Sequence, residues 1–307
     1  MARGPSCLIE AATRPDVDVV LNAVVGFAGL DATVAALRAG KRVALANKES
    51  LVVGGALVLE AARQGGGELV PVDSEHSAVL QCLAGGHGPA ARLTLTASGG
   101  PFREWPAGRI HGATVAEALQ HPTWRMGSKI TVDSATLVNK ALEVIEAHFL
   151  FGLDYSRIRV VVHPQSIVHA LVEFEDGSTV AQLGMPSMEL PILYALTYPD
   201  RADDVALPRY DPVAAGPLTF EPVRGEAFPA FAVGVEAGRR GGTAPAVFNA
   251  VNEEAVAAFL RGAVPFGRIA EVLERVCAAH QPAAVSTLEA VREADRWARH
   301  HAREMLG

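Results

Sequence analysis

The chain has 307 residues, 50% hydrophobic and 20% charged, which is typical of a globular protein large enough for two or more domains. The net charge of -7 and the lack of any run of Lys or Arg argue against nucleic-acid binding. No apolar segment is long enough to cross a membrane, no signal peptide is recognised, and three widely spaced cysteines predict a reducing, cytoplasmic location.

Residues 17–72 alternate between β-rich and helical patterns. Strands are predicted at 17–25, 41–46 and 68–72, and helices at 31–38 and about 54–64. This alternation predicts a doubly wound parallel sheet, in which ligands bind beyond the carboxyl ends of the strands. Asn47, Lys48 and Glu49 follow the second strand, so we expect them at that edge.

Asp73 and Glu75 follow the third strand, in the segment Val72-Asp-Ser-Glu-His-Ser77. If the extended pattern continues, both carboxylates project to the same side. Two adjacent carboxylates repel each other unless a cation or a proton lies between them. The pair therefore indicates a hard-metal site or an acid/base pair. The alternative is a solvated strand end, with Asp73 or Ser74 as the N-cap of a following helix.

The rest of the chain predicts an α+β region and then helices. Strands are expected at 92–97, 129–133, 157–162, 167–175 and 178–183, with an amphipathic helix at 139–151. Residues 198–225 are rich in Pro, Gly and Asp and indicate a linker. The helices expected after it are 229–239, 245–261, about 266–279 and 283–304, which implies a small C-terminal bundle.

The segment 134–143 combines a hydroxyl, an amide and an ammonium near a predicted helix start. Asn139, Lys140 and Glu143 share one broad face of that helix, and Ser134 lies at its entry. Hydrogen-bond donors, positive charge and the helix dipole together suit a phosphate. The alternative is a capped helix with a surface Lys-Glu pair.

Three further segments have both a functional and a structural interpretation. Ser98-Gly99-Gly100 offers backbone N–H groups to a phosphate, or is a glycine turn. The loop 121–127, with Trp124 and Met126, is a water-excluding lid, or a loop fixed by one buried Trp. A lone His163, like the methionine at 188, is more typical of structure and packing than of catalysis.

Taken together, these segments resemble the 1-deoxy-D-xylulose 5-phosphate reductoisomerase family. They come in family order and cover nearly the whole chain. The matching segments are Asn47–Ser50, Pro71–His76, Ser98–Arg103, His121–Gly127, Val132–Thr136 with Asn139, Lys140 and Glu143, His163–Ser166 and Asn249–Glu253. Each one alone is weak, whereas seven together are highly specific.

The resemblance implies a role for each matching residue. Asp73, Glu75 and Glu143 are implied as ligands of Mg²⁺ or Mn²⁺, hard cations that suit oxygen donors. The implied substrate-binding residues are Ser74, Ser98, His121, Trp124, Ser134, Asn139 and Lys140. The implied cofactor-binding residues are Asn47, Lys48, Glu49, Met126, Gly127 and Met188. Lys48 and His121 join the three carboxylates as implied catalytic residues.

The implied activity has two steps. The metal polarises oxygens of 1-deoxy-D-xylulose 5-phosphate and supports rearrangement to an aldehyde. NADPH then reduces the aldehyde to 2-C-methyl-D-erythritol 4-phosphate, in non-mevalonate isoprenoid biosynthesis. The family also implies a homodimer, and neither a nucleic-acid nor a membrane partner is expected.

The chain departs from the family at its start. Family members begin with a strand and a turn of the type G-x-T-G-S-I-G, which receives the dinucleotide pyrophosphate, and Gly26-Phe-Ala-Gly29 does not replace it. We therefore expect an N-terminally truncated chain that binds NADPH weakly or not at all by itself. Metal and phosphate should still bind, because their residues lie within 73–143. The expected domains are a partial nucleotide-binding domain (1–72), an α+β catalytic domain (73–197), the linker (198–225) and a helical domain (226–307).

Two other interpretations stay open on the sequence. One is a cofactor-free, metal-dependent sugar-phosphate aldolase or isomerase that releases an aldehyde. The other is a catalytically impaired remnant or a regulatory binding subunit. A Gly-rich loop encoded in frame upstream of Met1 would support truncation, and an NADPH-oxidation assay with the phosphosugar would separate the other two.

Overall fold

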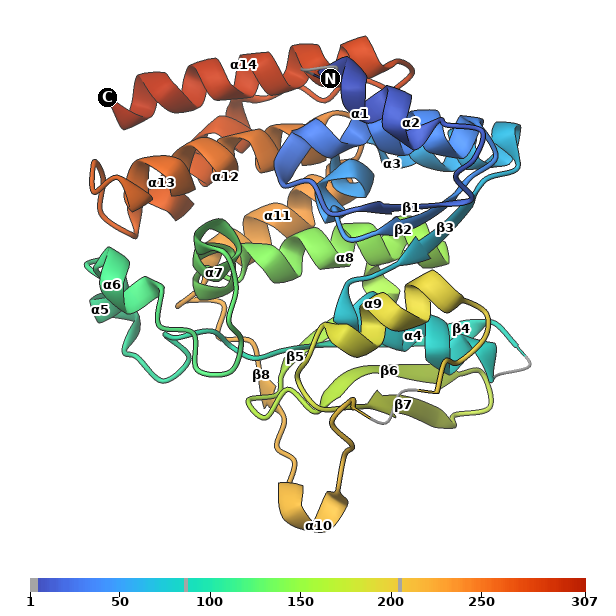
Figure 1. Cartoon of the computed structure of the whole chain (residues 1–307). Helices are drawn as coiled ribbons and strands as arrows, with labels where there is room; N and C mark the ends of the chain where they lie inside the picture. The colour runs from blue at the N-terminus through green and yellow to red at the C-terminus, as the bar shows by residue number, and fades with distance from the viewer. Residues whose placement is uncertain (1–4, 86–87, 204–205) are drawn as a thin grey trace.

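Three short parallel strands form the first sheet, in the order β1 (Val19–Asn22), β2 (Arg42–Leu45) and β3 (Glu68–Pro71) (Figure 1). The computed structural model describes residues 5–85, 88–203 and 206–307. The helices α2 (Leu30–Arg38) and α3 (Lys48–Gly65) cover one face of the sheet, and α9 (Glu189–Thr197) lies against the other. Covering both faces explains why the strands are mostly apolar, with polar residues only at their ends, at Asn22, Arg42 and Glu68. The predicted parallel pairing of the strands is confirmed.

The helix α3 begins six residues earlier than the sequence pattern indicates. Asn47 is its N-cap, and its side chain accepts the backbone N–H of Ser50. Gly54 has non-helical backbone angles and kinks the helix, which interrupts the helical pattern there. As a result, Lys48 and Glu49 lie in the first turn of a helix and are buried. A further helix, α1 (Pro5–Ala12), was not predicted and packs on α2.

The second sheet is mixed, in the order β7-β6-β4-β5-β8. Its strands are β4 (Ala90–Ala97), β5 (Ile158–Val162), β6 (Val168–Phe174), β7 (Thr179–Leu183) and β8 (Glu221–Pro222). β4 and β5 are parallel, and the other pairings are antiparallel. The helices α4 (Ser74–Ala84) and α8 (Val138–Phe151) pack against this sheet, and α8 also contacts α3. α8 therefore lies between the two sheets, as Figure 1 shows.

The strand predicted at 129–133 is wrong, because these residues belong to the helix α7 (Ser128–Ala135). The Thr131 hydroxyl and backbone N–H both bond to the Gly127 carbonyl oxygen one turn earlier. α7 packs against α8 and against a helix more than 100 residues later in the chain. This packing overrides the β-propensity of Ile130, Thr131 and Val132. Two short helices, α5 (Ala107–Ile110) and α6 (Val115–Ala118), precede α7.

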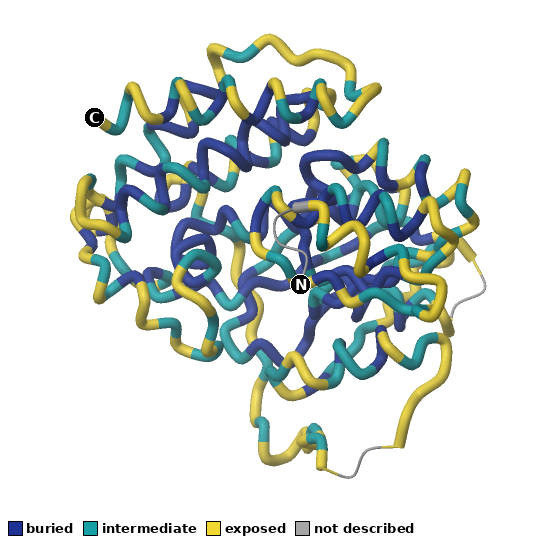
Figure 2. The backbone as a smooth tube through the Cα atoms, turned by 45° about the horizontal axis from the view of Figure 1, so that its top comes forward, coloured by how far each residue is buried: buried dark blue, intermediate teal, exposed yellow. Residues whose placement is uncertain are grey.

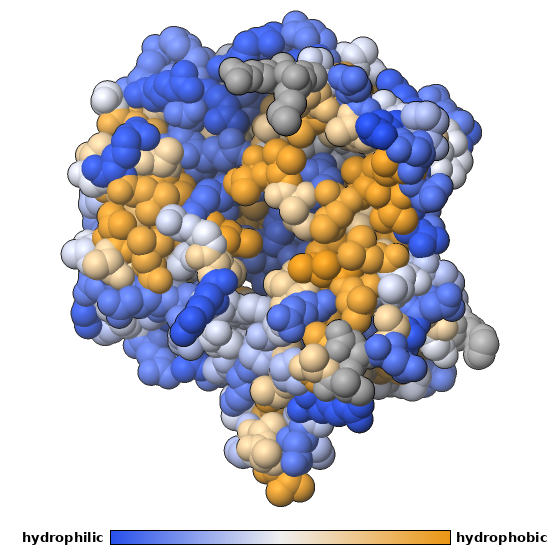
Figure 3. Space-filling model, in the orientation of Figure 1, coloured by the Kyte–Doolittle hydropathy of each residue, from blue (hydrophilic) through white to orange (hydrophobic). Residues whose placement is uncertain are grey.

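The segment expected as a linker also contributes to the second sheet. After α9 the chain extends away from the body, forms α10 (Pro212–Ala215) and returns as β8, which pairs with β5 (Figure 1). We call residues 206–220 the arm. Val213 in the arm is 89% exposed, and the end of the arm is apolar in Figure 3.

Four helices complete the chain, close to the predicted positions. They are α11 (Pro229–Arg240), α12 (Ala244–Leu260), α13 (Arg268–Ala279) and α14 (Leu288–Leu306). α12 is buried along most of its length, and it packs against α13 and α14 but also against α3 and α7 (Figure 2). The division of the chain into domains stays a prediction. No helix within the described ranges has the length and apolarity needed to cross a membrane.

Candidate active site

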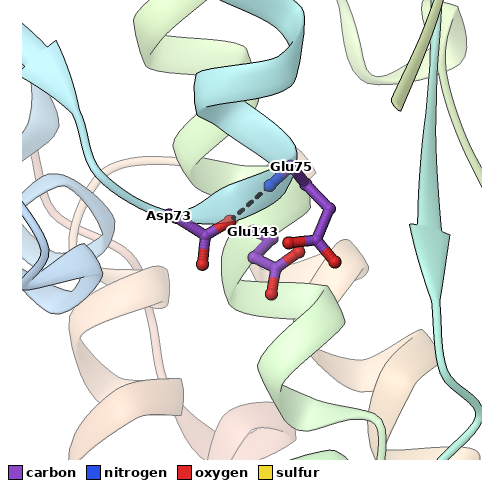
Figure 4. Close-up of side chains that lie close together, drawn as sticks. All are labelled: Asp73, Glu75 and Glu143. Atoms are coloured by element: carbon purple, nitrogen blue, oxygen red, sulfur yellow. Dashed lines mark hydrogen bonds between the residues drawn. The ribbon is translucent and has the colours of Figure 1, made fainter. Parts of the chain in front are cut away.

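Three carboxylates converge where α4 begins beside α8. Asp73 is the N-cap of α4, Glu75 lies in its first turn, and Glu143 projects from α8 (Figure 4). One oxygen of each carboxylate lies within 4.8 Å of the others. Asp73 also accepts the backbone N–H of Glu75 at 3.3 Å, so it caps the helix and belongs to the cluster. The pair is therefore brought together by a helix start, and the expected strand alternation is wrong.

Two buried lysines lie between the carboxylates. Lys48 Nζ donates to Asp73 Oδ2 at 2.7 Å and lies 3.2 Å from Glu143 Oε1. Lys140 Nζ donates to Glu75 Oε1 at 2.7 Å and also to Glu143 Oε2. Lys140 was predicted to bind the substrate, and this stays a prediction; its ammonium contacts the carboxylates and lines the cavity beside them. The two lysines supply the positive charge at the centre of the cluster.

Burial and neighbouring charges shift the pKa values of the carboxyl and ammonium groups in this cluster. Burial, followed by the charges of the neighbouring carboxylates, raises the pKa of Glu143 to about 7. Burial alone would raise the pKa of Asp73 too, but the Lys48 ammonium holds it well below its usual range. Burial lowers an ammonium pKa, yet the surrounding carboxylates raise the pKa of Lys48 and of Lys140 above the ordinary value. A divalent cation would favour the ionised form of Glu143, and the three carboxylates supply the oxygen donors that suit a hard divalent cation.

A buried histidine, His76, contacts the backbone of Glu143 and was not predicted to have a role. His76 Nε2 lies 2.9 Å from the backbone oxygen of Glu143, and its Nδ1 lies 3.0 Å from Glu146 Oε2. Both His76 and Glu146 are fully buried. Burial lowers the pKa of His76, but the Glu146 carboxylate outweighs it and raises that pKa to about 9. The signal in the sequence was Glu146, three residues after Glu143 on the same helix face.

A cavity of ≈ 200 Å³ opens beside the carboxylates and brings the predicted phosphate-binding residues together. Its lining includes Ser98, His121, Trp124, Met126, Ser134, Asn139 and Met188. Ser98 Oγ lies 3.0 Å from His121 Nε2 at one end. Asn139 joins the cavity to the cluster, because its Oδ1 accepts from Lys48 at 2.9 Å and its Nδ2 donates to Glu143. Segments that are far apart in the chain therefore share one site.

Close backbone packing places Ser98 near the end of α7. Gly100 has φ 66°, and a Cβ added there would lie 2.7 Å from the Ser134 carbonyl oxygen. Only glycine combines this left-handed backbone with so close an approach. The turn at 98–100 is therefore a glycine turn that also directs Ser98 into the cavity.

The hydrogen bonds of His121 fix which of its ring nitrogens carries the proton. Its Nδ1 accepts the backbone N–H groups of Thr123 and Trp124 at 3.1 and 2.8 Å. The proton is therefore on Nε2, which donates to Ser98. Burial lowers the pKa of His121 to about 4, so the ring is neutral at physiological pH. The cavity that the carboxylates border is therefore also lined by a neutral N–H donor.

A second cavity of ≈ 360 Å³ lies at the carboxyl ends of β1 and β2. It is lined by Val24, Val25, Asn47, Lys48, Glu49, Gly127, Lys129 and Ile130, among others. Figure 3 shows the surface hollowed between α7 and the first sheet. Four of the six predicted cofactor-binding residues line this cavity: Asn47, Lys48, Glu49 and Gly127. The other two, Met126 and Met188, line the first cavity. Lys48 and Asn139 line both, so the two cavities adjoin.

His163 has a structural environment. Its Nδ1 donates to the Thr219 carbonyl oxygen at 2.8 Å, and its Nε2 accepts the backbone N–H of Ile167 at 3.1 Å. Its ring stacks on Phe220 with centroids 4.7 Å apart. His163 therefore holds the returning end of the arm against β5.

Comparisons with known proteins place the whole chain beside one family. Residues 1–55 match the family model "1-deoxy-D-xylulose 5-phosphate reductoisomerase", and two C-terminal domain models of this enzyme match residues 69–151 and 183–301. The chain is 53% identical over 303 residues to the 1-deoxy-D-xylulose 5-phosphate reductoisomerase of Synechococcus sp. (strain JA-2-3B'a(2-13)), covering 97% of this chain and 76% of the relative. It is 56% identical to that of Leifsonia xyli over 293 residues, covering 95% of this chain and 80% of the relative.

Solved structures agree with these matches. The Zymomonas mobilis enzyme in complex with NADPH has a TM-score of 0.91 and 43% identity, covering 99% of this chain and 78% of that one. A DOX-P reductoisomerase in complex with NADPH, fosmidomycin and magnesium has a TM-score of 0.91 and 40% identity, covering 99% and 79%.

Proposed function

This chain belongs to the 1-deoxy-D-xylulose 5-phosphate reductoisomerase family, and we propose that it catalyses the NADPH- and divalent-metal-dependent conversion of 1-deoxy-D-xylulose 5-phosphate to 2-C-methyl-D-erythritol 4-phosphate. One observation carries the proposal: the carboxylates Asp73, Glu75 and Glu143 border the same cavity as Ser98 and Ser134. A cation site and an anion site in one cavity suit a phosphosugar whose reacting oxygens lie away from its phosphate.

The metal ligands in this proposal are Asp73, Glu75 and Glu143. A divalent cation held there would supply the positive charge that stabilises substrate oxygens as they become anionic. Lys48, whose pKa is raised by the carboxylates around it, stays protonated and donates hydrogen bonds to the same region. Ser74, whose hydroxyl lies 2.6 Å from Glu75 Oε2, is positioned to orient substrate hydroxyls.

The phosphate site in this proposal is the end of the first cavity that holds Ser98, Ser134, Asn139 and His121. The serine hydroxyls donate hydrogen bonds to the phosphate oxygens. The Nε2–H of neutral His121 donates to Ser98 Oγ, which leaves the hydroxyl hydrogen of Ser98 free for the phosphate. Trp124 and its loop cover the cavity and exclude water from the reactive aldehyde.

The cofactor in this proposal lies in the second cavity. Its position beyond the carboxyl ends of parallel strands is where such sheets bind dinucleotides. NADPH supplies the reducing equivalents for the second step. The cofactor-free aldolase alternative is not favoured, since a similar solved structure is an NADPH complex.

An assay of the purified chain tests the function. Because the sequence predicts weak NADPH binding by this chain, the assay uses an excess of NADPH. We expect loss of NADPH absorbance that requires both the phosphosugar and Mg²⁺ or Mn²⁺, with 2-C-methyl-D-erythritol 4-phosphate as product. Glu143→Gln should abolish this activity, whereas Glu173→Gln, a partly exposed change on β6, should leave it intact. Release of an aldehyde without NADPH consumption would instead support the aldolase.

We also infer a homodimeric, cytoplasmic enzyme. The exposed Val213 and Phe220 of the arm support self-association, since large apolar side chains gain from burial in an interface. Light scattering should show a dimer that Val213→Lys weakens. The free cysteines Cys7, Cys82 and Cys277 are consistent with a reducing compartment.

A further inference from the structure

Lys129 is a partly buried cation to which the proposed reaction assigns no task. It lies in the first turn of α7, two residues after the end of the loop 121–127, and its side chain is 21% exposed. Its Nζ lies 2.9 Å from Glu49 Oε1 and 2.8 Å from Asp133 Oδ2. One ammonium therefore joins the downstream end of the loop to the first turn of α3.

Both partners of Lys129 are themselves fixed. Asn252 in α12 donates from Nδ2 to Asp133 Oδ1 at 2.7 Å, and Asn47 donates from Nδ2 to Glu49 Oε2 at 3.1 Å. The result is a continuous polar chain from the C-terminal helices to the end of β2. Asn252 belongs to the Asn249–Glu253 segment, which the proposed reaction also leaves without a task.

Stability alone does not account for this arrangement. Asp133 is 1% exposed and Glu49 is 9% exposed, so an ion pair here gives up much of its hydration. Buried ion pairs of this kind are often no more stabilising than well-packed apolar residues of the same size. What the ion pair does provide is a defined geometry between the first turn of α3 and the first turn of α7.

The ion pair lies at the second cavity. Lys129, Glu49 and Asp133 line the second cavity, and Glu49 directly follows Lys48, which contacts the carboxylate cluster. Gly127, the last residue of the loop, lines the same cavity. A shift of Lys129 would therefore move a wall of this cavity and free one end of the loop.

We propose that Lys129 is a positioning residue, which ties the end of the loop 121–127 to the first turn of α3 and so keeps the cofactor-side cavity in its binding shape. This inference rests on the proposed function for its kinetic consequence only. The structural part of the proposal, that Lys129 joins the loop to α3, can be tested without measuring enzyme activity.

The first test measures order in the loop. Trypsin cleaves after Arg125, which is exposed in the loop, and mass spectrometry resolves the fragments 1–125 and 126–307. In Lys129→Met we expect cleavage there about tenfold faster, because local opening of the loop no longer breaks an ion pair. Lys129→Arg should restore slow cleavage, and Lys41→Met, at the opposite end of β2, should not change it.

The second test measures the kinetic consequence. We expect Lys129→Met to raise the KM for NADPH about tenfold with kcat within about threefold of wild type, and Lys129→Arg to recover most of the loss. The Mn²⁺ affinity from calorimetry should be unchanged, since Lys129 is not in the carboxylate cluster. If Lys129→Met does not fold, Asn252→Ala keeps both ion pairs, and we expect it to raise cleavage and KM in the same direction by about threefold.

An unchanged rate of cleavage after Arg125 in Lys129→Met would overturn the proposal that Lys129 ties the loop to α3. A lowered melting temperature with unchanged KM and kcat would reduce Lys129 to a structural residue and overturn its positioning role. A wild-type chain that oxidises no NADPH with substrate present would refute the proposed function, while the cleavage comparison would still decide whether the tether exists.

Discussion

The buried pair of His76 and Glu146 makes the free energy of unfolding depend on pH in a defined way. The pKa of His76 rises from 6.5 to about 9 on folding, which corresponds to about 3.5 kcal/mol at about 1.4 kcal/mol per unit, and Glu146 is the largest of the charges that raise it. Because the folded pKa is raised, this contribution is fully present below about pH 6.5 and is lost as the pH rises through about 9. Glu146→Gln removes the carboxylate that Nδ1 of His76 contacts.

We therefore expect Glu146→Gln to lower the free energy of unfolding by about 3 kcal/mol at pH 6, and by much less at pH 9.5. Urea denaturation in metal-free buffer at a series of pH values measures the difference. Glu60→Gln is the matched control, because its ion pair with Arg63 lies at the surface, and we expect little change at either pH. A loss for Glu146→Gln that is equal at both pH values would refute the assignment of a charged His76.

Glu143→Gln should weaken Mn²⁺ binding at least about tenfold in calorimetry, because one of three carboxylate ligands is lost; an unchanged affinity would contradict the metal site. Gly234→Ala should destabilise the chain by about 1–3 kcal/mol in urea, because the added methyl would lie 2.5 Å from Phe248 Cζ, whereas Gly225→Ala has open space and should change little. The pKa of His121 falls from 6.5 to about 4 on folding, so the wild type loses stability as the pH drops through that range. His121→Asn should reduce this loss of stability. An equal fall in the melting temperatures of both proteins between pH 7 and 5 would count against a buried, neutral ring.

Much of the secondary structure was predictable because it depends on local patterns. The apolar strands of the first sheet, the strands at 158–162 and 168–174 and the helix α8 all lie close to their predicted positions. The segment 129–133 shows the limit, since its β-branched residues favour a strand locally while packing against α8 and α12 makes it helical. Similarly, the start of α3 was missed because the kink at Gly54 interrupts its pattern.

The sequence by itself determined the family and the residue types of the site, because motif spacing and residue chemistry are properties of the chain. The matching motifs alone predicted Asp73, Glu75 and Glu143 as one set of metal ligands, and the three carboxylates do meet. The tertiary structure alone decided how the charges are balanced: it placed Lys48 between Asp73 and Glu143, and Glu146 beside His76. Coulomb energies depend on distance and burial, and residues 70 to 95 positions apart acquire both only when the helices and sheets pack together.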